Sequence, residues 1–345
     1  MVQKACLVVI DGWGISAETR GNAVSNASTP SMEALSKMAS QPLSAHGLSV
    51  GLPVGLMGNS EVGHLNIGAG RIVYQDIVRI ELAISHNSLC AQPAVKDAFH
   101  AAKLNGQIHL AGLVSDGGVH SHISHLLVLL QGAKDAGITN AYVHVFGDGR
   151  DVAPKSIKIY LEMLQTWMDE NNYGSVATIT GRYYAMDRDK RWERVKAAYD
   201  GMCHGVGEKT QDYMATIDKR YEGGETDEFF KPIICDPAGS IKNGHVVLCF
   251  NFRSDRMREI SQAFIAPPFE TQAVTGLNVT TMTVYKAEFP FPTIFPPQTM
   301  SNCLGEWLAA QKIPQVHIAE TEKVICADLV CPCHLLFQRW QRRAV

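Results

Sequence analysis

A serine surrounded by glycines is the first candidate for chemistry. The stretch GLMGNSEVGHLNIGAG, residues 55–70, places Ser60 among five glycines. Glycine lets the backbone approach a ligand and adopt positive φ without a steric penalty. We expect a loose bend that presents Ser60 to solvent. There it could act as a nucleophile once a partner activates it, or it could be a polar turn residue. These residues alone leave both interpretations open.

A second pattern places charged side chains directly after short apolar runs. The runs expected to be buried strands cover residues 5–10, 108–114, 141–146, 175–180 and 245–250. The charged residues that follow them are Asp11, Asp116, His120, Arg150, Asp151, Arg182, Arg188, Arg253 and Arg256. In open α/β sheets, ligands bind beyond the carboxyl ends of the strands, and arginine grips phosphate and carboxylate through paired hydrogen bonds. The pattern indicates a small anion such as a phosphorylated acid. The alternative is that these are ordinary polar surface loops.

The elements that must position these side chains alternate along the chain. Thr29-Pro30 is typical of a helix start, and an apolar helical segment runs through Leu126–Leu130. Strands that alternate with helices predict a parallel or mostly parallel sheet in an α/β protein.

Two histidine and cysteine clusters are weaker candidates for metal binding. His122 and His125 share a helical face, but no carboxylate or cysteine stands at a suitable spacing. We therefore expect His120 to contact a ligand and the other two histidines to be structural. The terminal cluster does not have the usual paired zinc-ligand spacing; its members are Cys326, Cys331, Cys333 and His334.

Composition restricts the class of protein. The chain has 345 residues and a net charge of −3, which argues against nonspecific binding to nucleic acid. No stretch approaches the roughly 20 apolar residues of a membrane span. Nine cysteines without a secretory signal indicate reduced thiols in a cytoplasmic protein. We expect a small-molecule substrate, and neither a nucleic acid nor a membrane as partner.

Seven motifs in order carry a specific resemblance. They are VVIDGWG at 8–14, LMGNSEVGHLNIGAGR at 56–71, LVSDGGVHSH at 113–122, FGDGRD at 146–151, GRYYAMDRDKRWER at 181–194, NFRSDR at 251–256 and AETEK at 319–323. The chain closely resembles the cofactor-independent (2,3-bisphosphoglycerate-independent) phosphoglycerate mutases. The resemblance implies an α/β fold in which a transferase domain is inserted into a metal-dependent phosphatase domain of the alkaline-phosphatase type. Expected boundaries are 1–75 and 301–323 for the phosphatase domain, 76–300 for the insert and 324–345 for an atypical tail.

The resemblance also implies an activity and a set of site residues. The family is an isomerase of glycolysis and gluconeogenesis that interconverts 3-phosphoglycerate and 2-phosphoglycerate through a phosphoserine, here Ser60. Asp11 and Ser60 correspond to metal ligands for Mn2+ or Mg2+, two ions per complete site, with no requirement for 2,3-bisphosphoglycerate. We expect a monomer. Substrate contacts correspond to His120, Arg150, Asp151, Arg182, Arg188, Arg253, Arg256 and Lys323.

The sequence departs from the family after Lys323. The remaining residues, VICADLVCPCHLLFQRWQRRAV, contain no counterparts of the family's other metal ligands. We therefore expect an incomplete phosphatase domain and an inactive chain as given. Two alternatives stay open: a non-catalytic phosphoglycerate-binding fragment, and a related metal-dependent phosphatase or phosphopentomutase.

Overall fold

The computed structural model describes residues 4–38 and 40–316, and it divides into two compact units. Unit 1 consists of the residues up to Val78 and those from Gln298 onward, and unit 2 spans Arg79–Pro297. Lys323 and the terminal cysteine cluster lie outside the described residues.

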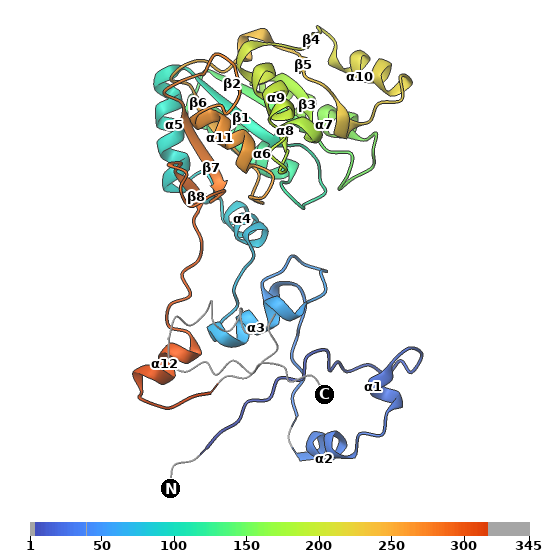
Figure 1. Cartoon of the computed structure of the whole chain (residues 1–345). Coiled ribbons are helices and arrows are strands. Elements are labelled where there is room, and N and C mark those ends of the chain that lie inside the picture. The colour runs from blue at the N-terminus through green and yellow to red at the C-terminus, as the bar shows by residue number, and fades with distance from the viewer. Residues whose placement is uncertain (1–3, 39, 317–345) are drawn as a thin grey trace. The chain divides into compact units, whose positions relative to one another are not determined.

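Unit 2 is built on one sheet of eight strands in the order β4-β5-β3-β2-β1-β6-β7-β8 (Figure 1). The strands are β1 Gln107–Leu113, β2 Asn140–Gly147, β3 Ser175–Gly181, β4 Glu208–Lys209, β5 Ile233–Ile234, β6 Val246–Cys249, β7 Asn278–Thr283 and β8 Thr293–Phe295. Neighbouring strands are parallel except that β5 runs antiparallel to β3. The predicted mostly parallel α/β sheet is confirmed.

Helices connect these strands and cover the sheet. They are α4 Asp76–Ser85, which spans the boundary between the units, α5 Pro93–Asn105, α6 Ile123–Asp135, α7 Ile157–Asn171, α8 Arg182–Ala185, α9 Trp192–His204, α10 Tyr213–Glu222 and α11 Arg258–Ile265. The crossovers α6 and α7 lead in one direction from β1, whereas α11 leads in the other from β6. Because such crossovers are right-handed, the two directions place their helices on opposite faces. One face buries a cluster that includes Tyr199 of α9 and Phe264 of α11.

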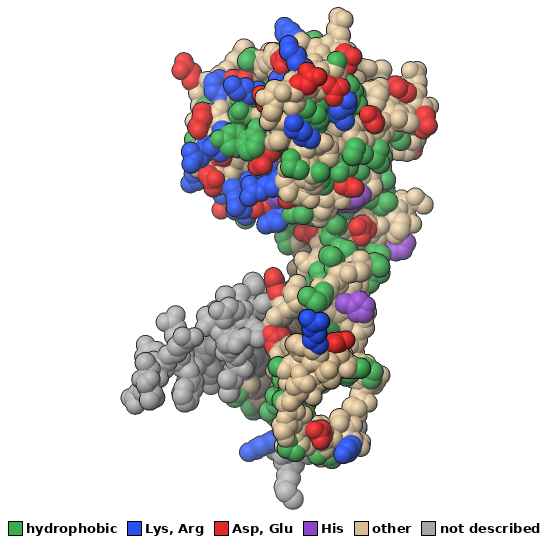
Figure 2. All heavy atoms as spheres, turned by 90° about the vertical axis from the view of Figure 1, so that its right-hand side faces the viewer, with side chains coloured by type: hydrophobic (Ala, Val, Ile, Leu, Met, Phe, Trp, Pro, Cys, Tyr) green, Lys and Arg blue, Asp and Glu red, His purple; other side chains and the backbone are tan. Residues whose placement is uncertain are grey.

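Unit 1 differs from its sequence-based expectation. Its helices are α1 Ala23–Asn26, α2 Pro30–Met38, α3 Ser60–Ala69 and α12 Leu304–Ala310, with a 3-10 turn at Gly47–Val50. The helix start at Pro30 is confirmed. The strand predicted at 5–10 is wrong: these residues are extended but form no strand, and Leu7 and Val8 are 70% and 71% exposed. A strand needs a neighbour to pair with, and within the described residues none pairs with this segment. Figure 2 shows hydrophobic side chains on the surface of this unit.

A chain of hydrogen bonds between histidines crosses four neighbouring strands of unit 2. Thr178 Oγ1 lies 2.9 Å from His144 Nδ1, and His144 Nε2 lies 3.0 Å from His109 Nδ1. His109 Nε2 in turn lies 3.0 Å from His245 Nδ1, just before β6. His109 and His144 are fully buried.

One backbone donor fixes the direction of this chain. The Lys242 N–H donates to His245 Nδ1 at 3.0 Å, so that nitrogen is an acceptor. His109 Nε2–H must then donate to it, His144 Nε2–H must donate to His109, and the Thr178 hydroxyl must donate to His144. His109 and His144 are therefore neutral Nε2–H tautomers, and protonating either of them would place two donors face to face.

This arrangement predicts loss of stability in acid. Burial, together with the charges of His144 and His245, lowers the pKa of His109 to about 2, and burial lowers the pKa of His144 to about 3. Histidines in the unfolded chain have a pKa near 6.5. As the pH falls below that value, the unfolded state therefore binds more protons than the folded state, which shifts the equilibrium toward unfolding. Stability is therefore complete above pH 6.5 and declines below it. At pH 5 the loss should reach about 2 kcal/mol for each of these two histidines.

Urea unfolding followed by circular dichroism between pH 7.5 and 4.5 measures this decline. Above pH 4.5 the aspartates with lowered pKa contribute little, since their protonation begins below that range. His100→Gln, at an exposed position of α5, is a control that should leave the slope unchanged. A flat profile from pH 7 to 5 would contradict the prediction.

Candidate active site

Arginines converge on a cavity of about 400 Å³ at the carboxyl edge of the sheet of unit 2. The cavity is lined by five arginines and three carboxylates, with aromatic and methionine side chains between them. The arginines are Arg150, Arg182, Arg188, Arg194 and Arg256. The sequence analysis selected four of these five, which lie up to 106 positions apart in the chain but meet here. Arg253 does not line this cavity. It contacts Asp255, which in turn contacts the lining residue Arg188.

Arg182 is the buried centre of the set. It follows β3 directly and is 2% exposed, and its Nη1 donates to Asp148 Oδ1 and to Asp151 Oδ2, each at 2.6 Å. Gly181 is needed before it, because a Cβ there would stand 2.3 Å from the carbonyl oxygen of Glu228. This close approach brings the Glu228 segment against the start of α8. The sequence predicted Arg182 as a ligand group, and the structure shows that it also holds the loop after β2.

Asp148 organises that loop. Its Oδ1 accepts the backbone N–H groups of Arg150 at 3.2 Å and Asp151 at 3.0 Å, and its Oδ2 accepts the Ser115 hydroxyl at 2.7 Å. Burial alone would raise the pKa of Asp148, but these hydrogen bonds and Arg182 lower it below its ordinary value. The sequence analysis did not select Asp148, although it stands in FGDGRD. Its signal was its place as the first charged residue after the strand.

Asp255 is a second carboxylate that the sequence reasoning missed. Its Oδ2 accepts from Arg188 Nη1 at 3.2 Å, and its Oδ1 lies 3.1 Å from Arg253 Nε and 3.9 Å from His120 Nδ1. Burial would raise its pKa, but Arg253, His120 and Arg188 outweigh burial and lower it. Asp255 therefore joins three predicted site residues that arise from three different loops.

His120 is neutral at physiological pH. It is 3% exposed, and burial together with the Arg182 charge lowers its pKa to about 4 against the opposing effect of Asp151 and Asp255. Its Nε2 lies 3.8 Å from Asp151 Oδ2. Its Nδ1 is buried and makes no hydrogen bond within the described part of the chain. A neutral ring can offer a ligand either an N–H or a lone pair.

The pKa of Arg256 is influenced by the other arginines of the cavity. Burial and then the charges of Arg188, Arg182 and Arg150 lower its pKa, with Asp255 acting in the opposite direction. Its Nη1 donates to the carbonyl of Met186 at 3.2 Å. Positive charges that repel one another in this way favour an anion between them. The cavity is therefore suited to a small, multiply charged anion.

In unit 1, Ser60 begins a helix, which corrects the expected loose bend. The Asn59 side chain accepts the Val62 N–H at 3.1 Å and caps α3, so two of the glycines after Ser60 are helical. The Ser60 hydroxyl donates to Asp11 Oδ2 at 2.7 Å and lies 3.3 Å from His64 Nδ1. The structure thus brings together Asp11 and Ser60, the two residues that the resemblance implies as metal ligands. His64, one helical turn after Ser60, was not selected from the sequence.

The described residues supply only part of the metal site that the resemblance implies, namely Asp11 and Ser60. A carboxylate and a hydroxyl are hard oxygen donors of the kind that Mn2+ and Mg2+ accept. Across residues 4–38 and 40–316, however, no group of three or more histidine, cysteine, aspartate or glutamate side chains could hold an ion. Two donors are too few for one metal ion, so we derive no chemical step through a metal.

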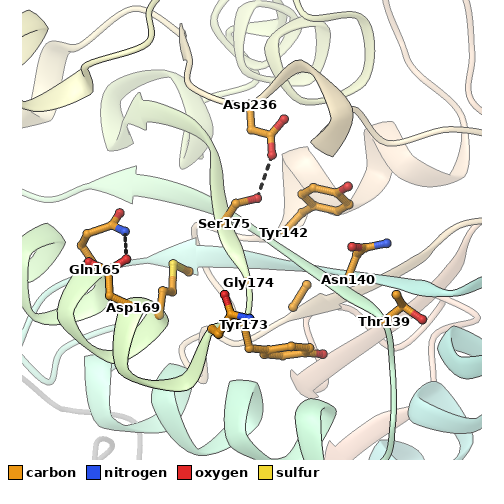
Figure 3. A pocket seen from close by; sticks show the side chains of 12 residues that line it. Thr139, Asn140, Tyr142, Gln165, Asp169, Tyr173, Gly174, Ser175 and Asp236 are labelled. Carbon is orange, nitrogen blue, oxygen red and sulfur yellow. Dashed lines mark hydrogen bonds between the residues drawn. The ribbon is translucent and has the colours of Figure 1, made fainter.

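A larger cavity, of about 440 Å³, lies at the other end of the strands, beside the first residues of β2 and β3 (Figure 3). Its lining contains no arginine, lysine or histidine, and its charged members are Asp169 and Asp236. The Ser175 hydroxyl donates to Asp236 Oδ2 at 2.9 Å, as Figure 3 shows. Because its charge is negative, this cavity does not suit an anionic ligand, and the arginine-lined cavity is the candidate site.

Comparisons with known proteins show which family the chain resembles. The family described as "BPG-independent PGAM N-terminus" matches residues 80–287, which hold the arginine-lined cavity. The chain is 52% identical over 333 residues to the 2,3-bisphosphoglycerate-independent phosphoglycerate mutase of Onchocerca volvulus, and 50% identical over 333 residues to that of Caenorhabditis elegans. Its structure is similar to the crystal structure of Leishmania mexicana phosphoglycerate mutase at low cobalt concentration. The TM-score is 0.66 at 31% identity, covering 88% of this chain and 59% of that one.

These relatives are longer than the chain. The matches cover 93% and 94% of this chain but only 64% and 62% of the Onchocerca and Caenorhabditis proteins. Among the described residues, no helix has the length and apolar character that crossing a membrane requires.

Proposed function

Since the chain belongs to the family of 2,3-bisphosphoglycerate-independent phosphoglycerate mutases, we propose that the arginine-lined cavity of unit 2 binds phosphoglycerate. The observation that carries this proposal is the convergence on one cavity of five arginines from the segments that follow β2, β3 and β6, near a neutral buried histidine. Phosphoglycerate carries a phosphate and a carboxylate on a three-carbon skeleton, and both groups match the forked donors of arginine.

Within the cavity we assign roles by burial and partner. Arg182 is held by two carboxylates and is the least mobile donor, so it fixes the geometry of the loop after β2. Arg150 and Arg188 are about half exposed, with side-chain exposures of 56% and 49%, and are free to close on a ligand. Asp151 and His120 are not among the residues that line the cavity, but Asp151 accepts from the lining residue Arg182, and His120 lies 3.8 Å from Asp151. We assign them as an acceptor and a neutral imidazole for the glycerate hydroxyl.

We assign phosphate acceptance to Ser60 of unit 1. In the proposed reaction its hydroxyl oxygen forms a bond to phosphorus, the bond from phosphorus to the substrate oxygen breaks, the Ser60 proton passes to a base, and the released glycerate oxygen takes up a proton to become a hydroxyl. Asp11, which already accepts that proton in a hydrogen bond at 2.7 Å, is placed to receive it. Transfer back to the other hydroxyl of the glycerate gives the isomer. Asp11 and Ser60 would be two of the ligands of the manganese or magnesium ion that the family implies, and the described residues supply no third histidine, cysteine, aspartate or glutamate ligand beside them.

The domains, the oligomeric state and one more residue complete the proposed assignment. We assign unit 2 as the inserted transferase domain and unit 1 as part of the phosphatase domain, which is compatible with the family match to residues 80–287. We also propose a monomer that works in the cytoplasm, and Lys323 as a further substrate contact.

Calorimetry of the 345-residue chain with 3-phosphoglycerate tests the proposal. Arg256→Ala should weaken binding by roughly 1.5–3 kcal/mol, as expected when a charged hydrogen bond is lost. Arg258→Ala is a matched control, because that guanidinium donates to the carbonyl of Tyr285 and is not among the residues that line the cavity. Wild-type affinity in the Arg256→Ala variant would show that this arginine serves only to hold the Met186 carbonyl.

A further inference from the structure

A short loop presents Arg188 to the cavity. It joins α8 to α9 and contains Asp187, Arg188, Asp189, Lys190 and Arg191. Arg188 itself is half exposed, and its guanidinium contacts Asp255. The position of its side chain therefore depends on the backbone of the loop.

Asp187 ties that backbone together. The residue is 4% exposed, and its Oδ2 accepts the N–H groups of Asp189 at 3.0 Å and Arg191 at 2.9 Å. Between these two donors stands Lys190 with φ of +56°, in the left-handed region that costs a side chain about 1 kcal/mol or more. The two hydrogen bonds on either side of Lys190 maintain this unfavourable turn.

The other oxygen of Asp187 anchors the loop to the helices on both sides. Its Oδ1 lies 3.6 Å from Nη1 of Arg194, in the first turn of α9. The Arg194 guanidinium lies 3.8 Å from the centre of the Tyr183 ring, in α8. The Arg194 side chain is 20% exposed, so this contact is largely shielded from solvent. Asp187 is thus connected to both helices that the loop joins.

We propose that Asp187 is a positioning residue that holds the loop in the conformation that presents Arg188 to the anion. This inference rests on the proposed function of the cavity. It opposes what charge alone would predict: a carboxylate in the lining of an anion-binding cavity repels the ligand, so removing its charge should strengthen binding. If Asp187 acts through the loop, removing its charge weakens binding instead.

The test uses Asp187→Asn in the 345-residue chain, with 3-phosphoglycerate as the probe in calorimetry. We expect binding weaker by about tenfold, part of what a charged hydrogen bond to the ligand contributes. Arg188→Ala should weaken binding more, and adding Asp187→Asn to Arg188→Ala should cause no further loss, because two changes that act through one contact do not add. Asp212→Asn is the matched control, since Asp212 accepts the Ala215 N–H at the start of α10 and is not among the lining residues.

A second measurement does not depend on the ligand. Hydrogen–deuterium exchange of the amides of Asp189 and Arg191 should accelerate in Asp187→Asn, and a further Lys190→Gly change should restore part of the affinity because glycine adopts positive φ without strain. Unchanged exchange, unchanged or tighter binding, or losses that add in the double variant would each overturn the inference. If the wild-type chain does not bind 3-phosphoglycerate, the proposed function fails, and the exchange measurement still decides whether Asp187 orders the loop.

Discussion

Arg182→Met is expected to lower the free energy of unfolding of unit 2 by about 3–5 kcal/mol, because it leaves two carboxylates without their buried cation. Asp148 is 2% exposed and Asp151 has a side-chain exposure of 16%, so neither has full access to solvent. With the arginine gone, Asp148 loses a partner that lowers its pKa, and the loop that carries Arg150 loses its anchor. Binding of 3-phosphoglycerate should fall below detection. Urea unfolding monitored by circular dichroism and calorimetry on the same samples measure both effects.

Arg150→Met separates stability from binding in the same cavity. The Arg150 side chain is 56% exposed, and its ion pair with Glu228 spans 3.5 Å, so its removal should change stability by less than about 1 kcal/mol. Its loss should still weaken ligand binding.

Wild-type stability in Arg182→Met would mean that the two carboxylates find other partners or take up protons at no cost, and the assigned role of Arg182 would be wrong.

Alanine at the serine that matches Ser60 in the full-length Onchocerca volvulus relative is expected to reduce isomerisation by at least about 10⁴-fold, as loss of a covalent nucleophile does. The reason lies in the local geometry of this chain: Ser60 is the first residue of α3 and donates its proton to Asp11 at 2.7 Å. Alanine keeps the helix but removes the oxygen that would accept the phosphoryl group. Coupled assays of 3-phosphoglycerate conversion and mass spectrometry of acid-quenched enzyme measure activity and phosphoenzyme together.

The matched control is an alanine substitution at the position of the relative that corresponds to Ser36, because in this chain the Ser36 hydroxyl donates to a carbonyl within α2. That variant should retain normal turnover and phosphoenzyme. Near-normal isomerisation without the Ser60 hydroxyl would mean that the phosphoryl group never visits this serine.

The sequence predicted the sheet of unit 2 well because its strands are buried on both faces. Strands β1, β2, β3 and β6 are mostly apolar without regular alternation and are buried over nearly their whole length, a pattern that a solvent-facing strand does not show. The same pattern failed at residues 5–10. Apolar character shows that a segment needs covering, but a strand forms only where a neighbour supplies hydrogen bonds, and a single run cannot reveal whether the neighbour is there.

At the site, the sequence by itself determined which arginines are available and that they follow parallel strands, since the carboxyl ends of such strands meet at one edge. Only the tertiary structure decided their roles. Burial makes Arg182 a structural centre and leaves Arg150 exposed, although both are arginines after neighbouring strands. The sequence analysis did not select Asp148 and Asp255, because their roles depend on hydrogen bonds from residues of distant loops, Ser115 for Asp148 and Arg188 for Asp255. The physical reason is that residue type and spacing fix local geometry, whereas burial and ion pairing depend on contacts between segments far apart in the chain.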